Sequence, residues 1–218
     1  MTTGATMRAD RRSRYGWPRS VRVMILVIAL GLIAGAVIGT RIAPRGPAAL
    51  HGVAADGDRA APEFTLTDQH GQPFQLSAAR GHVVLLVFGY TECPDACPLT
   101  LATWARARVR LAADATRVRF VFISVDPPRD SPERIGRYLA QFDQAFIGLT
   151  GSSGDIEGTV IAYGAFVRVE QASSDRPEVI AHSEATFLID AAGRIIEAFP
   201  TGASAEDIAA DVKTVLGR

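Results

Sequence analysis

The stretch TECPDACP, residues 91–98, decides the fold of this chain. It holds the only two cysteines of the sequence, Cys93 and Cys97. The run VVLLVFGY (83–90) directly before it is short, apolar and rich in valine, which is typical of a buried strand. Pro98 favours the first turn of a helix. The two thiols are therefore predicted on a strand-to-helix turn, with Cys97 near the helix N-terminus, where the helix dipole favours a thiolate.

Strand and helix patterns alternate on both sides of this turn. The predicted strands, in chain order, are 64–68, 74–76, 83–90, 118–125, 145–149, 166–170, 184–190 and 195–199. The predicted helices are 97–113, 131–142, 155–164 and 203–216. Strand–helix alternation followed by an antiparallel pair implies an α/β fold, in which helices flank a mixed sheet. A cysteine pair at the end of the first long parallel strand indicates that this sheet is thioredoxin-like.

The N-terminal region predicts a membrane anchor. Residues 1–22 are rich in arginine, and the uncharged run 23–40 nearly spans a hydrocarbon core roughly 30 Å thick. We therefore predict a basic cytoplasmic segment (1–22), a transmembrane helix (23–43), a flexible linker (44–59) and a folded domain (60–218). A cleaved signal peptide is the alternative. The positive-inside rule places the folded domain on the periplasmic, extracytoplasmic side of a bacterial-type cytoplasmic membrane.

Charge is distributed unevenly along the chain. The formal net charge is zero, but residues 1–45 carry eight arginines and one aspartate. The remainder carries 15 basic and 22 acidic residues, which is a net charge of −7. Because nucleic acids attract basic surfaces, an acidic folded domain argues against nucleic acid as a partner.

The cysteine pair allows three interpretations. A structural disulfide is compatible with a location outside the reducing cytosol, although so small a loop adds only about 2 kcal/mol of stability. Thiol–disulfide exchange is the second, although thioredoxins place two residues between their cysteines and this chain has three. Copper binding is the third, because thiolate and imidazole ligands suit this soft ion. The spacing of Cys93 and Cys97 leaves all three open.

His182 and Asp126 are further candidates for the same site. His182 precedes the predicted strand 184–190, where thioredoxin-like proteins place a loop that faces the cysteine turn. A neutral imidazole at that place can complete a three-coordinate site. Asp126 follows the predicted strand 118–125 and is a weak fourth ligand or an outer hydrogen-bond partner of the ligands. Its alternative role is to shape the turn before Pro127.

Other polar residues are assigned structural roles. Three histidines fall in the linker, in a turn and ahead of a strand, and are predicted to be ordinary surface or satisfied residues: His51, His70 and His82. Asp130 and Ser131 precede a proline at a predicted helix start and are expected to cap that helix.

Three motifs in this order resemble the Sco/SenC family, the membrane-anchored thioredoxin-fold proteins of cytochrome c oxidase assembly. They are GYTECPDACP at 89–98, ISVDPPRDSP at 123–132, and HS at 182–183 ahead of the strand TFLID at 186–190. The likeness covers roughly residues 60–218 and extends to the predicted anchor. Three motifs in sequence are far more specific than a lone pair of cysteines.

The resemblance implies a function for the cysteine turn. It implies that copper, as Cu(I) or Cu(II), is held by two thiolates and one imidazole, which here fall on Cys93, Cys97 and His182. It implies a metallochaperone that helps assemble the CuA centre of cytochrome c oxidase. The partners would then be oxidase subunit II and an upstream copper donor or thiol reductant. The alternative is a metal-free thiol–disulfide oxidoreductase that reduces cysteines of a respiratory-chain protein, with Cys93 and Cys97 as its redox pair.

Two residues of the turn bear on this assignment. Glu92 stands where the family usually has a histidine, just before the first cysteine. That histidine is not one of the family's usual copper ligands, so the implied ligand set is unaffected, although the charge beside the site changes. Tyr90 stands where a peroxiredoxin-like peroxidase would have a threonine, which disfavours peroxide chemistry.

Overall fold

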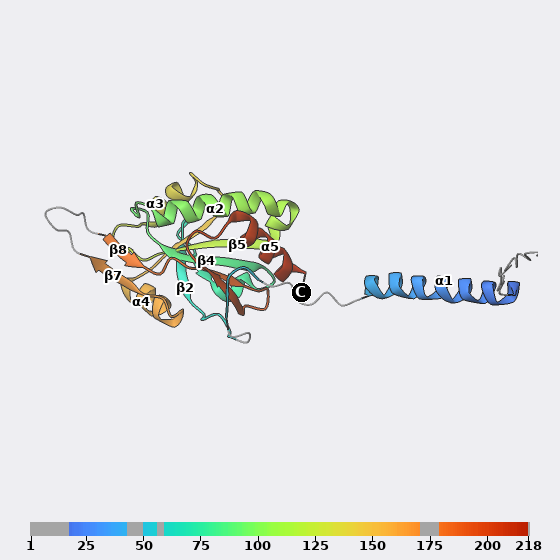
Figure 1. The fold of residues 1–218 in the computed structure, drawn as a ribbon. Coiled ribbons are helices and arrows are strands. Elements are labelled where there is room, and N and C mark those ends of the chain that lie inside the picture. The colour runs from blue at the N-terminus through green and yellow to red at the C-terminus, as the bar shows by residue number, and fades with distance from the viewer. Residues whose placement is uncertain (1–17, 43–49, 56–58, 171–178, 218) are drawn as a thin grey trace, which may run out of the picture. The chain divides into compact units, whose positions relative to one another are not determined.

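The structure is a computed structural model, shown as a ribbon in Figure 1. It describes residues 18–42, 50–55, 59–170 and 179–217. The polar loop predicted at 173–178 lies outside these ranges, as do most of the basic segment and much of the linker. The chain divides into two compact units, of which the first ends at Ala48 and the second begins at Ala49.

The first unit contains one described helix, α1 (Arg19–Ile42), which covers most of the predicted transmembrane segment 23–43. Within the described residues, no helix combines the length and the apolar character that crossing a membrane requires. The membrane segment at 23–43 stays a prediction.

The second unit is built on an eight-stranded mixed sheet with the order β1-β10-β9-β4-β5-β6-β2-β3. The bounds of its strands are β1 (Val53–Ala54), β2 (Thr65–Asp68), β3 (Pro73–Gln75), β4 (Val83–Gly89), β5 (Val118–Ser124), β6 (Ile147–Thr150), β9 (Thr186–Ile189) and β10 (Ile195–Phe199). The strands β4, β5 and β6 run parallel, whereas β2 and β9 join them antiparallel. The predicted mixed, thioredoxin-like sheet is confirmed.

The centre of the sheet is the parallel pair β4–β5. All seven residues of β4 are buried, because helices cover both faces of the sheet. The two strands are in register along their length, and Gly89 at the end of β4 lies opposite Ser124 at the end of β5. The cysteine turn and the loop after β5 therefore leave the sheet side by side.

Helices cover both faces of the sheet. One hydrophobic core lies beneath α2 (Ala96–Leu111), α3 (Pro132–Leu139) and α5 (Ala205–Leu216). The other lies beneath α4 (Ser153–Ala162) and the 3-10 helix η1 (Leu76–Ala79). A second 3-10 helix, η2 (Ala112–Arg117), follows α2. A serine caps each of three helices by accepting a hydrogen bond from a backbone N–H of the first turn: Ser131 on α3, Ser152 on α4 and Ser204 on α5.

A second sheet has only two strands, β7 (Val167–Glu170) and β8 (Val179–His182). They pair antiparallel, with Val167 opposite His182. The sequence predicted β7 but not β8, and His182 was expected in a loop. The four residues of β8 are too few to show a clear alternation, and the strand is stabilised by its pairing with β7.

The folded unit begins before the predicted boundary at residue 60. The strand β1 pairs with β10, so this part of the predicted linker belongs to the sheet. The backbone N–H of His51 donates to the Asp211 carboxylate over 2.7 Å, and its Nδ1 lies 2.8 Å from the same group. The backbone N–H of Gly52 donates to Glu197 over 2.8 Å. His51 therefore belongs to the folded unit, which it contacts through Asp211.

These contacts predict a pH-dependent stability. Glu197 is completely buried, and burial together with the neighbouring Asp211 carboxylate raises the pKa of Glu197 to about 7. The folded protein therefore keeps this proton where the unfolded chain has lost it, so the free energy of unfolding falls as pH rises from about 4.5 to 7. We expect the Glu197 carboxyl to lower the wild-type free energy of unfolding by an amount on the order of 2 kcal/mol over this pH range. Glu197→Gln, which mimics the protonated form, should not show this contribution. Urea unfolding at several pH values measures it.

The matched control is Glu157→Gln, because Glu157 is exposed on α4. We expect this variant to retain the wild-type pH dependence. The His51 pKa is also raised, mainly by its hydrogen bond with Asp211, so a smaller loss of the same sign remains in Glu197→Gln. Identical pH profiles for wild type and Glu197→Gln would contradict the prediction.

Candidate metal centre

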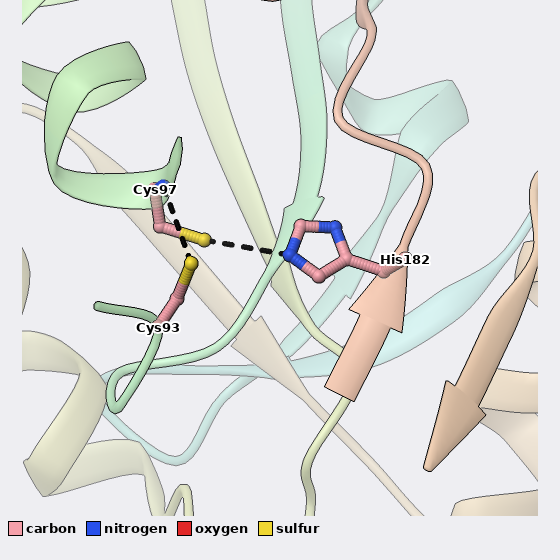
Figure 2. Close-up of side chains that lie close together, drawn as sticks. All are labelled: Cys93, Cys97 and His182. Carbon is pink, nitrogen blue, oxygen red and sulfur yellow. Dashed lines mark hydrogen bonds between the residues drawn. The ribbon is translucent and has the colours of Figure 1, made fainter. Parts of the chain in front are cut away.

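Two sulfurs and one ring nitrogen from distant parts of the chain meet at one end of the sheet (Figure 2). One ligand atom from each of Cys93, Cys97 and His182 lies within 4.8 Å of the other two. Cys93 lies in the turn after β4, Cys97 is the second residue of α2, and His182 ends β8. In the part of the chain that the structure describes, no other group of three or more possible metal ligands is found. The three residues predicted as ligands are thus adjacent.

The start of α2 controls the charge state of the two cysteines. The backbone N–H of Cys97 donates to Cys93 Sγ over 3.4 Å, so the helix N-terminus faces that sulfur. The hydrogen bond from the Cys97 side chain, aided by His182 and opposed by burial, lowers the pKa of Cys93 to about 3. The same hydrogen bond and burial raise the pKa of Cys97. The helix end thus favours a thiolate on Cys93, whereas the sequence pointed to Cys97.

The hydrogen bonds of His182 fix its tautomer. Its Nδ1 lies 3.0 Å from the backbone carbonyl oxygen of Ser183. A carbonyl only accepts, so Nδ1 carries a proton and the neutral ring keeps its lone pair on Nε2. Nε2 lies 3.7 Å from Cys97 Sγ and points towards the two sulfurs (Figure 2). The orientation of the imidazole is therefore compatible with a metal ligand.

The acid–base state of His182 reflects the same neighbours. Burial lowers the pKa of His182, but the Cys93 sulfur and the Ser183 carbonyl outweigh burial and raise it overall. A proton shared with the Cys93 thiolate is thus favoured in the metal-free site. Because a metal ion must displace that proton, binding is expected to weaken as pH falls.

Two residues beside these three side chains restrict their positions, and neither was predicted from the sequence to have a role in the site. The Tyr90 hydroxyl accepts a hydrogen bond from the backbone N–H of Ile180 over 3.3 Å, and its ring meets that of His182 edge-on at 5.7 Å. A Cβ atom at Gly89 would lie 2.7 Å from Cys97 Sγ, so only glycine fits. Both residues lie at the end of the predicted strand 83–90, directly before the cysteine turn, and this position was the only sign of their role in the sequence.

Asp130 anchors the cysteine turn and does not cap α3 as predicted. Its carboxylate is fully buried and accepts from the backbone N–H and the hydroxyl of Thr91, over 2.9 and 2.5 Å. It also accepts from the Ser124 hydroxyl over 2.6 Å. Ser131 alone provides the cap of α3. The acid therefore joins the turn after β4 to the end of β5.

Asp126 and Glu92 both form ion pairs near the turn. The Asp126 carboxylate is buried and binds Arg129, and it is not among the grouped ligands. A hydrogen bond between Asp126 and one of the ligands, as expected from the sequence, stays a prediction. Glu92 Oε1 accepts from Arg134 Nη2 over 2.8 Å, and Oε2 lies 3.9 Å from Arg129 Nη1. Glu92 thus connects the cysteine turn to α3 and to the loop before it.

Comparison with known proteins identifies the relatives of this site. The family model described as SCO1/SenC matches residues 53–217, which is most of the chain. This chain belongs to the SCO1/SenC family. It is 34% identical to the SCO2-like protein of Rickettsia prowazekii over 188 residues, which cover 85% of this chain and 92% of that protein.

Solved structures of SCO1/SenC proteins share the fold. The copper-bound ScoI of Bradyrhizobium japonicum is 33% identical, with a TM-score of 0.66 over 72% of this chain and 99% of that one. A SCO1/SenC family lipoprotein from Bacillus anthracis is 26% identical, with a TM-score of 0.65 over 77% of this chain and 99% of that one. The family resemblance noted in the sequence is confirmed.

The low pKa of Cys93 predicts how the metal-free protein reacts with alkylating agents. We expect iodoacetamide to modify Cys93 at a nearly constant rate from about pH 5 to pH 8, because the thiolate is already formed. An ordinary cysteine, with a pKa near 8.5, reacts about tenfold faster for each pH unit in that range. Cys97, buried and protonated, should react far more slowly. Peptide mass spectrometry distinguishes the two sites.

The control is His182→Ala, which removes one of the groups that stabilise the thiolate. Its Cys93 should react with a steeper dependence on pH than the wild-type residue. A wild-type rate that climbs steeply between about pH 5 and pH 8 would show that Cys93 is an ordinary thiol.

Proposed function

We propose that this protein is a copper metallochaperone, which binds one copper ion through Cys93, Cys97 and His182 and passes it to the CuA centre of cytochrome c oxidase subunit II. The ion is cargo, so the site must hold it firmly and still release it to a partner. An upstream donor supplies the copper, and Cu(I) and Cu(II) are both compatible with sulfur and nitrogen ligands.

One observation carries this proposal. Two sulfurs and the lone pair of His182 Nε2 converge within 4.8 Å, where the turn after β4 meets the end of β8. Two thiolates and an imidazole form a soft ligand set, which favours copper over hard ions such as magnesium and calcium. A disulfide enzyme has no need of the oriented imidazole. Membership of the SCO1/SenC family, and the copper bound in the Bradyrhizobium relative, support the same assignment.

Release of the ion is favoured on the Cys93 side. Cys93 is partly exposed, whereas Cys97 and His182 are 4% and 7% exposed. An incoming thiolate of the recipient therefore reaches the ion beside Cys93 and replaces the protein's ligands one after another. Cys97 and His182 hold the ion while this first exchange takes place.

Thiol–disulfide exchange is the second candidate function, and the charge state of the cysteine pair favours it. A thiolate at Cys93 next to a protonated thiol at Cys97 is the arrangement that attacks a disulfide and then resolves the mixed disulfide. In that case the protein would reduce the cysteines of an oxidase subunit or another respiratory-chain protein. His182 would then contribute to reactivity but would not be essential.

We infer that the folded unit works outside the cytoplasm and is held at the cytoplasmic membrane by the N-terminal region. An arginine-rich segment followed by an uncharged run of 18 residues supports this location. The relative from Bacillus anthracis is described as a lipoprotein, which is a membrane-attached protein.

Copper titration of the purified protein tests the proposed function. We expect about one copper per chain, with S–Cu charge-transfer absorption for Cu(II). Replacing a ligand in Cys93→Ala, Cys97→Ala or His182→Ala should lower the affinity at least 100-fold, since changes to mere supporting residues already cost about 10–100-fold. His70→Ala is the control, because this exposed histidine lies in the turn after β2.

Unchanged affinity in His182→Ala would exclude the three-ligand site. Oxidase assembly in cells then separates the two candidate functions. A strain with His182→Ala that assembles active oxidase as well as wild type, while the cysteine variants do not, would favour thiol exchange over copper delivery.

Protease treatment of intact spheroplasts tests the location. We expect added protease to digest the folded unit while a cytoplasmic marker protein survives, because the unit lies outside the membrane. Survival of the folded unit until the cells are lysed would place it in the cytoplasm and contradict the inference.

A further inference from the structure

Exposed apolar side chains gather beside the metal centre. In the described part of the folded unit, seven large apolar side chains are exposed: Val53, Leu99, Val109, Ile161, Phe166, Val167 and Val169. Five of these seven line two hollows in the surface, and only Val53 and Val109 do not. Such clustering marks a binding surface, because exposed apolar residues are otherwise scattered singly.

The two hollows form one continuous surface. The first, about 600 Å³, is the mouth of the metal centre and contains Cys93, His182 and Leu99. The second, about 820 Å³, lies between α4 and the hairpin β7–β8, which are neighbours in Figure 1. Phe166 and Ile180 line both. The residues Leu99, Ile161, Phe166, Val167 and Val169 are called the hairpin surface below.

Copper exchange requires a protein partner to cover this region. An incoming thiolate must approach to bonding distance of the ion beside Cys93, so the partner's surface has to rest on the mouth of the site. A specific protein interface covers about 800 Å² on each side, which is far more than the surroundings of one sulfur. The interface must therefore extend onto adjacent surface, and the adjacent apolar area is the hairpin surface.

The charges around the two hollows distinguish a protein partner from a lipid surface. The exposed or half-buried acids Asp95, Glu157 and Glu184 line them, while the lining base Arg129 is paired with Asp126. An acidic rim repels anionic lipid headgroups. It attracts a protein whose apolar contact residues are surrounded by basic ones.

We propose that the hairpin surface is the docking site for the protein that exchanges copper with Cys93, and that this partner presents apolar side chains framed by lysine or arginine. The inference rests on the proposed function and adds the place and the chemistry of the contact. It separates two tasks in the chain. Cys93, Cys97 and His182 hold the ion, and the hairpin surface selects the molecule that receives it.

The test compares copper transfer from full-length variants to two acceptors. One acceptor is the copper-free subunit II of cytochrome c oxidase, and the other is a small Cu(I) chelator, which needs no docking surface. We expect Phe166→Ser combined with Val169→Ser to slow transfer to subunit II about tenfold at low protein concentration. Transfer to the chelator and the copper affinity should not change. Val109→Ser is the matched control, because Val109 is 79% exposed but lines neither hollow.

A second variant tests the charge of the rim independently of the apolar contacts. Glu157 is exposed on α4, so Glu157→Lys should not disturb the fold. We expect it to slow transfer to subunit II, and we expect added salt to slow the wild-type reaction.

Each other outcome would overturn the proposal. Equal transfer rates to subunit II in the wild type and the Phe166/Val169 variant would exclude the hairpin surface while leaving the proposed function intact. Transfer to the chelator slowed as much as transfer to subunit II would show that these residues act on the metal centre and not in docking, which would also exclude the hairpin surface. Weaker binding of the variant to anionic vesicles, with normal transfer, would make the surface a lipid contact. Absence of transfer from the wild type to subunit II would refute the proposed function, and this inference with it.

Discussion

Asp130 holds the metal centre to the sheet through one buried carboxylate. It accepts hydrogen bonds from Thr91, in the turn after β4, and from Ser124, at the end of β5. The parallel register of β4 and β5 places Ser124 opposite Gly89, two residues before Thr91. A buried charge is tolerated only when such partners surround it, so the acid and its donors must stay together. The position of Cys93, two residues after Thr91, depends on this arrangement.

The features that were predicted correctly from the sequence are those that depend on residues close together in the chain. The buried strand β4, the helix after it and the position of Cys97 at the helix start follow from apolar runs and from Pro98, which lie within a few residues of one another. The strands β1 and β8 were missed because they are short and depend on partners far along the chain. The pKa of Cys93 is lowered mainly by the hydrogen bond from the Cys97 side chain, helped by a backbone N–H of α2, and the spacing of the cysteines alone does not show which sulfur is favoured.

His182 and Asp130 show two further limits of the sequence. His182 was identified through its place before a strand and through the family resemblance, but the strand β8 to which it belongs was not predicted. Asp130 lies just before a helix, where an acid usually caps, and only the folded structure shows that it binds Thr91 and Ser124 instead. Glu92 is similar, since the two arginines that face it come about 40 positions later in the chain. The Glu92 carboxylate is therefore paired with arginine and is not an unpaired negative charge beside Cys93.

The three proposed ligands come from two separate sheets. Cys93 and Cys97 follow a strand of the large sheet, while His182 ends a strand of the two-stranded sheet β7–β8. An ion bound by all three is therefore a cross-link between two parts of the domain that have no shared strand ladder. Without an ion, the Tyr90–Ile180 hydrogen bond and a shared apolar core hold the hairpin beside the cysteine turn. An ion would thus add a second tie between the hairpin and the cysteine turn, next to the hairpin surface that a partner would contact.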